Sequence, residues 1–178
     1  RTPLIGVHNR ENRAAAARAA LAAGANATGI QDTIDRFDGM AHRMVLAGDV
    51  DGVRYINDSK ATNVAAVLRA LEAFDAPIVL LMGGLDKGDQ FERIAPVAAG
   101  KVKQLITMGA AAETIADALR NSLPVATAAD MIAALRLADQ HAQPGDVVLL
   151  SPGCASFDQY DNYAQRGDDF KQQVVRLK

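Results

Sequence analysis

Apolar residues occur along this chain either in unbroken runs or at helical spacing. Residues 78–82 and 147–150 are continuous apolar runs, as in strands of a parallel sheet with both faces buried. A third strand is expected at residues 104–108 and a shorter one near 124–126. Helical patterns at residues 64–74, 110–119 and 128–141 alternate with these strands. This alternation predicts an α/β fold with a Rossmann-like, doubly wound, mostly parallel sheet.

The residues before this alternation predict two further units. Residues 43–47 and 53–57 are extended runs separated by a Gly- and Asp-rich turn at 48–52, which predicts an N-terminal β-hairpin. Upstream we expect a short strand at 3–7, an alanine-rich helix at 10–23, and a helix capped by Thr28. Such a segment could not bury a core of its own. We therefore expect residues 1–38 to be the tail of a preceding domain and residues 39–178 to form a second domain.

Composition and charge narrow the class of protein. The chain has 178 residues, 49% of them hydrophobic, which suits one ordinary domain plus a remnant of another. Its formal net charge of −2, with no basic cluster, argues against binding to nucleic acid or a membrane surface. One cysteine and three histidines give no disulfide framework and no zinc pattern. We expect a soluble cytoplasmic protein with no metal site of its own, and the start at Arg1 suggests a piece of a longer chain.

Residues 57–63 combine a carboxylate, an ammonium group and short polar side chains between a strand and a helix. Asp58 could accept hydrogen bonds from ribose hydroxyls, while Lys60 and helix N–H groups suit phosphate or carboxylate. The simpler interpretation is an N-cap formed by Asp58 or Ser59 beside a solvated lysine.

Residues 83–88 form a glycine-rich turn that carries Lys87. The turn lacks the spacing of a P-loop and of a dinucleotide fingerprint. Its glycines would let the backbone approach a ligand, and Lys87 would supply a charge for an anion. A flexible surface loop explains the same residues.

The last apolar run leads into residues 151–160, which carry two hydroxyls, one thiol and free backbone N–H groups. In open α/β sheets ligands bind at the carboxyl edge of the strands, so this loop suits an anion. A plain strand-to-helix turn is the alternative. Cys154 has no histidine near it in sequence, which favours a packed thiol over a nucleophile.

Two polar pairs lie in the first part of the chain. Asn9 and Asn12 are three residues apart, on one face of the expected helix, and their amides suit an adenine edge, although capping would explain Asn9 alone. His42 and Arg43 lie in the link between the two segments, where the guanidinium could reach a phosphate or could simply be solvated.

Together these stretches resemble the Mur ligases, and within them the branch that adds D-glutamate. The resemblance covers almost the whole chain in the family's order. It is carried by residues 8–12 (HNxxN), 39–43 (GxxHR), 57–63 (NDSKATN), 83–88 (GGxxKG), 149–159 (LLSPxCASFDQ) and 162–170 (NYxxRGxxF). Gly153 stands where alanine is usual, and Tyr163 where phenylalanine is common.

The resemblance implies a UDP-binding domain, a central ATPase domain and a C-terminal Rossmann-like domain. This chain would hold the end of the second and the whole third. The family's P-loop, Mg²⁺ ligands and carbamylated lysine would then lie upstream, and the fragment would be inactive by itself. The implied function is ligation of D-glutamate to UDP-N-acetylmuramoyl-L-alanine in peptidoglycan precursor synthesis, through an acyl phosphate, by a monomer that uses ATP and Mg²⁺.

The resemblance also implies roles for matching positions. The implied ATP-binding residues are Asn9 and Asn12 on the adenine side, His42 and Arg43 at the hinge, Asp58 at the ribose and Lys60 near the phosphates. The implied D-glutamate residues are Thr62 and Lys87 at the α-carboxylate, with Ser156, Phe157 and Tyr163 around the side-chain carboxylate. Lys87, Arg43 and Lys60 are the residues expected to take part in catalysis.

Three alternatives remain open. One is another amide ligase of the same superfamily, either a folylpolyglutamate-type enzyme or another Mur branch. Another is a non-catalytic nucleotide-binding module that regulates a partner. A nicotinamide-dependent oxidoreductase is disfavoured because the glycine fingerprint is missing.

Overall fold

A six-stranded sheet with helices on both faces forms the body of the molecule. The computed structural model describes residues 7–37 and 39–177. The strands lie in the order β1-β2-β6-β3-β4-β5, and every pair is parallel except β1 with β2. Their bounds are β1 Val45–Val50, β2 Val53–Asn57, β3 Ile78–Gly83, β4 Val102–Met108, β5 Val125–Ala128 and β6 Val147–Gly153. The expected Rossmann-like, mostly parallel sheet with an N-terminal hairpin is confirmed.

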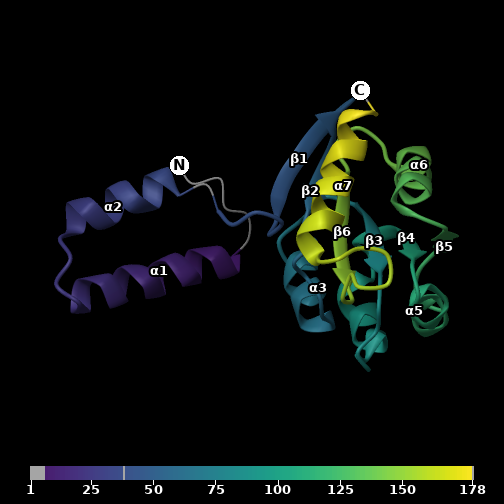
Figure 1. Ribbon diagram of the computed structural model, residues 1–178, viewed down its shortest axis with the longest axis horizontal. Helices are drawn as coiled ribbons and strands as arrows, with labels where there is room; N and C mark the ends of the chain where they lie inside the picture. The colour runs from purple at the N-terminus through teal and green to yellow at the C-terminus, as the bar shows by residue number, and fades with distance from the viewer. Residues whose placement is uncertain (1–6, 38, 178) are drawn as a thin grey trace.

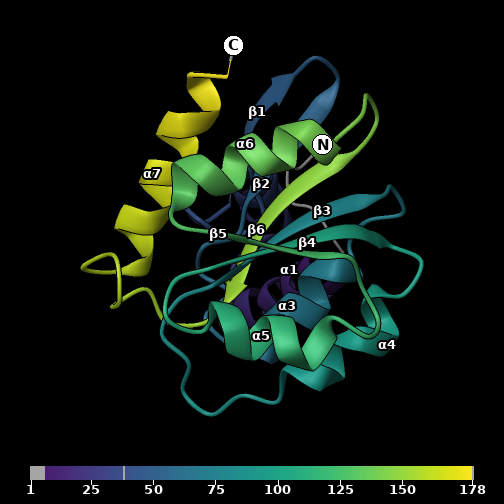
Figure 2. The ribbon, with the colours of Figure 1, turned by 90° about the vertical axis from the view of Figure 1, so that its right-hand side faces the viewer.

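Helices cover the two faces of this sheet unequally. The helices of the domain are α3 Val64–Leu71, η1 Phe91–Ile94, α4 Ala95–Ala98, α5 Ala112–Leu119, α6 Met131–His141 and α7 Tyr163–Val175. Figure 2 shows α6 and α7 on one side of the strands and α3, α4 and α5 on the other. Each side encloses its own apolar cluster, built around Leu80 and Leu149 on one face and Leu81 and Leu150 on the other. Alternate residues of β3 and β6 thus point to opposite cores, which explains their unbroken apolar sequence.

The hairpin between β1 and β2 has a tighter turn than the sequence predicts. Val50 pairs with Val53, so only Asp51 and Gly52 form the turn, both with positive φ (51° and 80°). Such φ values fit a two-residue turn of the kind that follows the twist of antiparallel strands. The expected turn at 48–52 is therefore wrong in length, because residues 48–50 belong to β1.

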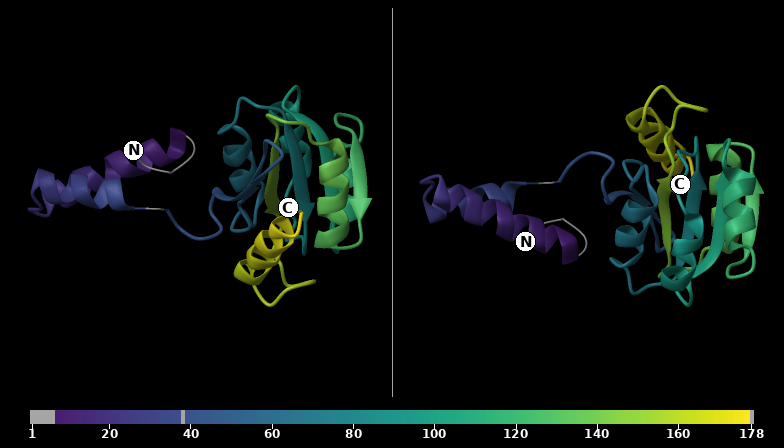
Figure 3. Two further views of the ribbon diagram at one scale, coloured as in Figure 1. Left: turned by 90° about the horizontal axis from the view of Figure 1, so that it is seen from above. Right: turned by 90° about the horizontal axis from the view of Figure 1, so that it is seen from below.

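Helices α1 Val7–Ala22 and α2 Ala27–Arg36 run side by side, away from the sheet (Figures 1 and 3). The strand expected at 3–7 lies largely outside the described residues; Val7 already belongs to α1. Asn9 lies inside α1 and so does not cap it. Asn26 caps α2 by accepting a 2.7 Å hydrogen bond from the N–H of Gly29, so the expected cap at Thr28 is wrong. Among the described residues, no helix combines the length and apolarity needed to cross a membrane.

One further boundary and two short elements also differ from the sequence prediction. The helix expected at 128–141 begins at Met131, because Ala128 ends β5 and Asp130 caps α6 through the N–H of Ala133 at 2.8 Å. The helical turns η1 and α4 were not predicted, since four residues each are too few to show a helical period.

Candidate functional site

The candidate site lies where β2, β3 and β6 end. These strands are neighbours in the sheet, and the register pairs Asn57 with Leu150 and Gly83 with Gly153. Because the three strands are parallel, the segments that follow them leave from one edge of the sheet. The stretches 57–63, 83–88 and 151–160, which the sequence singled out separately, therefore start side by side.

The side chain of Arg166, on α7, contacts all three of these segments and holds them together. Arg166 is 1% exposed. It donates to the Ser59 Oγ (3.0 Å) and carbonyl (2.9 Å) and, in the other two segments, to the carbonyls of Gly83 (3.3 Å), Cys154 (3.1 Å) and Ala155 (3.4 Å). Burial lowers the pKa of the Arg166 guanidinium to about 10, which leaves it charged at neutral pH. A single buried cation thus fixes the relative positions of the three strand ends.

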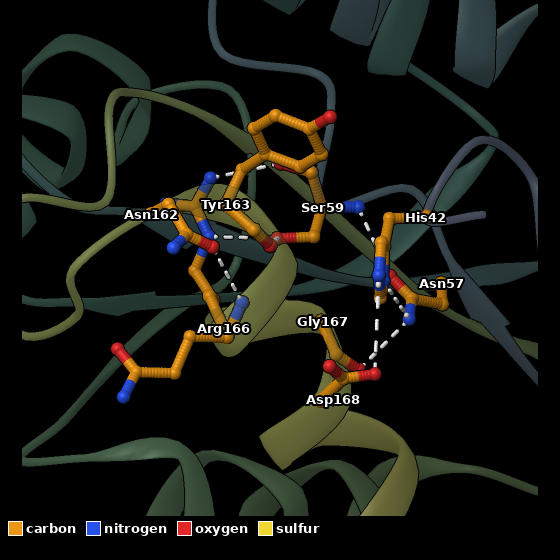
Figure 4. Close-up of polar contacts among 9 residues, drawn as sticks. His42, Asn57, Ser59, Asn162, Tyr163, Arg166, Gly167 and Asp168 are labelled. Atoms are coloured by element: carbon orange, nitrogen blue, oxygen red, sulfur yellow. Dashed lines mark hydrogen bonds and ion pairs between the residues drawn. The ribbon is translucent and has the colours of Figure 1, made fainter.

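A second set of contacts joins the start of α7 to the end of β2 and to the hinge, the link at residues 39–44 (Figure 4). The Ser59 hydroxyl donates to the Tyr163 carbonyl at 2.7 Å, and the Asn57 amide donates to the Gly167 carbonyl at 2.8 Å. The same amide lies 3.2 Å from Nδ1 of His42. A Cβ on Gly167 would overlap the His42 ring, so only glycine allows this close approach. His42 itself adopts a positive φ of 59°.

Lys60 and Tyr163 meet directly. The Lys60 Nζ donates to the Tyr163 hydroxyl at 3.4 Å and lies 5.1 Å from the centre of its ring. The His42 and Tyr163 rings lie in a T-shaped arrangement, with 6.1 Å between their centres. The structure therefore brings together three candidate residues that the resemblance assigns to different ligands.

Asp58 is buried beside the hinge, with 5% of its surface exposed. Its carboxylate accepts hydrogen bonds from the Met44 N–H and the Ser151 hydroxyl, both at 3.2 Å. Burial outweighs these bonds and the nearby Arg43, and raises the pKa of Asp58 to about 7. Neither Asp58 nor Ser59 caps the following helix. Asn63 caps it by accepting from the N–H of Ala66 at 2.9 Å, so the N-cap interpretation of residues 58–59 is wrong.

Two cavities adjoin at Arg43. The first, of about 360 Å³, lies between α1, α2 and the hinge, and its lining residues are Asn9, Asn12, Arg13, Ala16, Thr33, Ile34, Phe37, Met40 and Arg43. The second, of about 200 Å³, lies between the hinge and α3, and its lining residues are Arg43, Met44, Asp58, Lys60, Ala61, Ala66, Arg69 and Ala70. Asn9 and Asn12 thus share one cavity with Arg43, and Asp58 and Lys60 share the other with it. The His42 ring packs against α7 and lines neither of these two cavities.

The remaining candidate residues lie in the loops after β2, β3 and β6. Ser156 is buried and Thr62 half-buried, whereas Lys87 is exposed and Phe157 keeps 69% of its surface exposed. Two backbone hydrogen bonds between Leu85 and Ala155, of 2.8 and 3.1 Å, join the loop of Lys87 to that of Ser156. A Cβ on Gly84 would overlap the Ala155 carbonyl, which explains why glycine is needed where these loops meet.

Several residues of the site received no role from the sequence. Arg166 belongs to one of the motifs of the sequence, but its five hydrogen-bond acceptors lie in three other segments, so the sequence does not reveal that it is buried among them. Arg13 and Arg69 line the two cavities, and an arginine on an expected helix gives no signal of that. Cys154 is 1% exposed and burial raises the pKa of its thiol to about 12, which agrees with the expected packed role.

The chain belongs to the Mur ligase family: residues 42–154 match the family model described as "Mur ligase, glutamate ligase domain". A relative from Desulfatibacillum aliphaticivorans, named UDP-N-acetylmuramoylalanine–D-glutamate ligase, is 53% identical over 174 residues, or 98% of this chain and 39% of the relative. One of the same name from Salinibacter ruber is 45% identical, over 98% of this chain and 38% of the relative. The chain thus spans about two fifths of the length of these curated relatives.

Solved structures show the same fold at low sequence identity. A pseudomurein peptide ligase type C from Methanothermus fervidus has a TM-score of 0.73 at 17% identity, covering 97% of this chain and 36% of that one. The UDP-N-acetylmuramate–alanine ligase of Thermotoga maritima has a TM-score of 0.71 at 13% identity, covering 99% and 40%.

Proposed function

We propose that this chain supplies the amino-acid site and part of the nucleotide site of an ATP-dependent ligase that joins D-glutamate to UDP-N-acetylmuramoyl-L-alanine. The observation that carries the proposal is the convergence of three polar loops on one sheet edge, held by Arg166. The identity of 53% to a relative with this name supports the choice of substrates. Residues 1–38 would belong to the central ATPase domain and residues 39–178 to the C-terminal domain of a cytoplasmic enzyme.

D-Glutamate carries two carboxylates, and the loops offer two groups of partners for them. Lys87 and Thr62 would hold the α-carboxylate, the lysine as a point charge and the threonine as a hydroxyl donor. Ser156, Phe157 and Tyr163 would surround the side-chain carboxylate. The backbone bonds between Leu85 and Ala155 hold the loop of Lys87 beside the loop of Ser156, which supports binding of one small ligand between them.

ATP fits the two adjoining cavities in the order base, ribose, phosphate. The first cavity is largely apolar and carries the amides of Asn9 and Asn12, which suits a purine. The second offers the Asp58 carboxyl for ribose hydroxyls and the charges of Arg43 and Lys60 for phosphates. Among the described residues no group of three or more His, Cys, Asp and Glu side chains could hold a metal ion, and we propose that the Mg²⁺ ligands lie mainly upstream in the full-length enzyme.

In the proposed reaction ATP phosphorylates the carboxylate of the muramoyl-alanine substrate, and ADP leaves. The amine of D-glutamate then attacks the acyl phosphate, the new C–N bond forms, and inorganic phosphate leaves from the tetrahedral intermediate. The share of this chain is to position the amine: Lys87 fixes the amino acid, while Arg43 and Lys60 balance phosphate charge. Holding the two reactants in a good orientation can lower the activation free energy by up to ~7–11 kcal/mol.

Another ligase of the superfamily is the competing function. Folylpolyglutamate synthase of Thermotoga maritima shares the fold, with a TM-score of 0.65 at 17% identity, so the fold alone does not select the amino acid. A non-catalytic nucleotide-binding module is the other alternative that an activity assay separates.

The test is ATP-dependent phosphate release by the full-length protein with UDP-N-acetylmuramoyl-L-alanine and a panel of D-glutamate, L-glutamate, L-lysine and diaminopimelate. Release with D-glutamate alone supports the proposal. Release with another amino acid assigns the protein to a sister branch. Absence of release with every amino acid favours the non-catalytic module.

A further inference from the structure

Arg13 lies on the cavity-facing side of α1. Asn9, Asn12, Arg13 and Ala16 follow the spacing of one helical face, and all of them line the cavity between α1, α2 and the hinge. The neighbouring Arg10 and Arg18 do not line it and are exposed. Arg13 therefore occupies a position on this helix that the other two arginines do not share.

The Nε–H group of Arg13 is buried and has no hydrogen-bond partner within residues 7–37 and 39–177. A buried donor without an acceptor destabilises the folded state, and more so when the group is charged. Native proteins rarely leave such a group unpaired. An acceptor from outside the described residues is therefore expected to meet Arg13.

The cavity also indicates what carries that acceptor. Arg13 and Arg43 line it, and none of the described residues that line it carries a carboxylate. The rest of the lining is mainly apolar, with Ile34, Phe37 and Met40 opposite α1. A volume of about 360 Å³ is within the range of ligand pockets. A flat, apolar ring with acceptor atoms on its edge meets all of these conditions.

We propose that Arg13 is a further nucleotide-binding residue, whose Nε–H donates to an acceptor nitrogen on the edge of the purine base. The proposal rests on the proposed use of ATP and adds a contact to it. The phosphates are placed elsewhere, because Lys60 and Arg69 line the second cavity and Arg13 does not. Arg13 should thus act on the base and not on the triphosphate.

Equilibrium binding to the full-length protein tests this separately from catalysis. Displacement of a fluorescent ATP analogue gives dissociation constants for ATP, for adenosine and for inorganic tripolyphosphate. Arg13→Met should weaken ATP and adenosine binding about tenfold, as expected for loss of a hydrogen bond to a charged donor, and leave tripolyphosphate unchanged. Arg18→Met, on the same helix but outside the cavity, is the matched control and should change none of the three. Thermal unfolding of each variant shows whether it is folded, and Arg13→Gln, which removes the Nε–H group but stays polar, replaces Arg13→Met if the latter is not.

The outcomes separate the possible roles of Arg13. Equal weakening of adenosine and tripolyphosphate would overturn the base contact and place Arg13 at the phosphates. A lowered melting temperature with unchanged binding would overturn the proposal and make Arg13 a packing residue. Selective loss of adenosine binding in a protein that shows no ligase activity would support the role of Arg13 while refuting the proposed function.

Discussion

Replacing Arg166 should loosen the site and the domain together. Arg166→Met keeps most of the side-chain volume but removes all five hydrogen bonds. Three of them, to the Ser59 hydroxyl and carbonyl and to the Cys154 carbonyl, measure 2.9–3.1 Å. At about 1 kcal/mol net for each good bond, the loss is about 3 kcal/mol. That is a large share of the roughly 5–15 kcal/mol by which a domain is stable.

Urea unfolding followed by far-UV circular dichroism measures this loss. Arg176→Met, at the exposed end of the same helix, is the control and should change stability by less than about 0.5 kcal/mol. In the full-length enzyme, Arg166→Met should raise the KM for D-glutamate more than the KM for ATP, since all three tethered loops carry or adjoin amino-acid candidates. Arg166→Lys keeps the charge, so its stability and its KM for D-glutamate should lie between those of Arg166→Met and of the unchanged protein. If Arg166→Met lowers the free energy of unfolding by less than about 1 kcal/mol and leaves the KM for D-glutamate unchanged, Arg166 does not hold the three loops in place.

Three further changes test other parts of the site. The pKa of Asp58 is raised from 3.8 to about 7, so the folded state holds this proton more tightly than the unfolded state does. The free energy of unfolding should therefore fall as the pH rises between these two values. Urea unfolding at several pH values measures this slope, and Asp58→Asn should flatten it. Gly167→Ala would press a methyl group into the His42 ring and should lower the free energy of unfolding by about 1–3 kcal/mol. Adding His42→Ala in the same chain should recover most of this stability. Additive losses in the double variant would contradict the contact. Lys87→Ala should raise the KM for D-glutamate roughly tenfold or more, with Lys171→Ala as control, and an unchanged KM would remove Lys87 from the site.

The sheet could be predicted because its strands carry their own signal. Residues 78–82 and 147–150 are apolar without alternation since each faces two cores, and that pattern depends on local sequence alone. Boundaries set by side-chain capping were less accessible: Asn26, Asn63 and Asp130 each cap a helix, and several nearby residues could have done so.

The shared position of the candidate loops could be predicted, but the side-chain contacts between them could not. The convergence of residues 57–63, 83–88 and 151–160 follows from their position after parallel strands. The role of Arg166 does not, because its acceptors lie between 11 and 107 positions away in the sequence. The same holds for the contact of Lys60 with Tyr163, which are 103 positions apart.

The position of β6 has a consequence for how the domain is made. β6 is the last strand in the sequence, yet it lies between β2 and β3 and pairs with both. During synthesis the hairpin of β1 and β2 and the unit of β3, β4 and β5 therefore emerge as two pieces with no sheet bond between them. Only when residues 147–153 leave the ribosome can the two pieces join, and until then two apolar strand edges stay open to other chains. We therefore expect the pairing of β6 to complete the sheet late in folding and, through the following α7, to bring the three loops together.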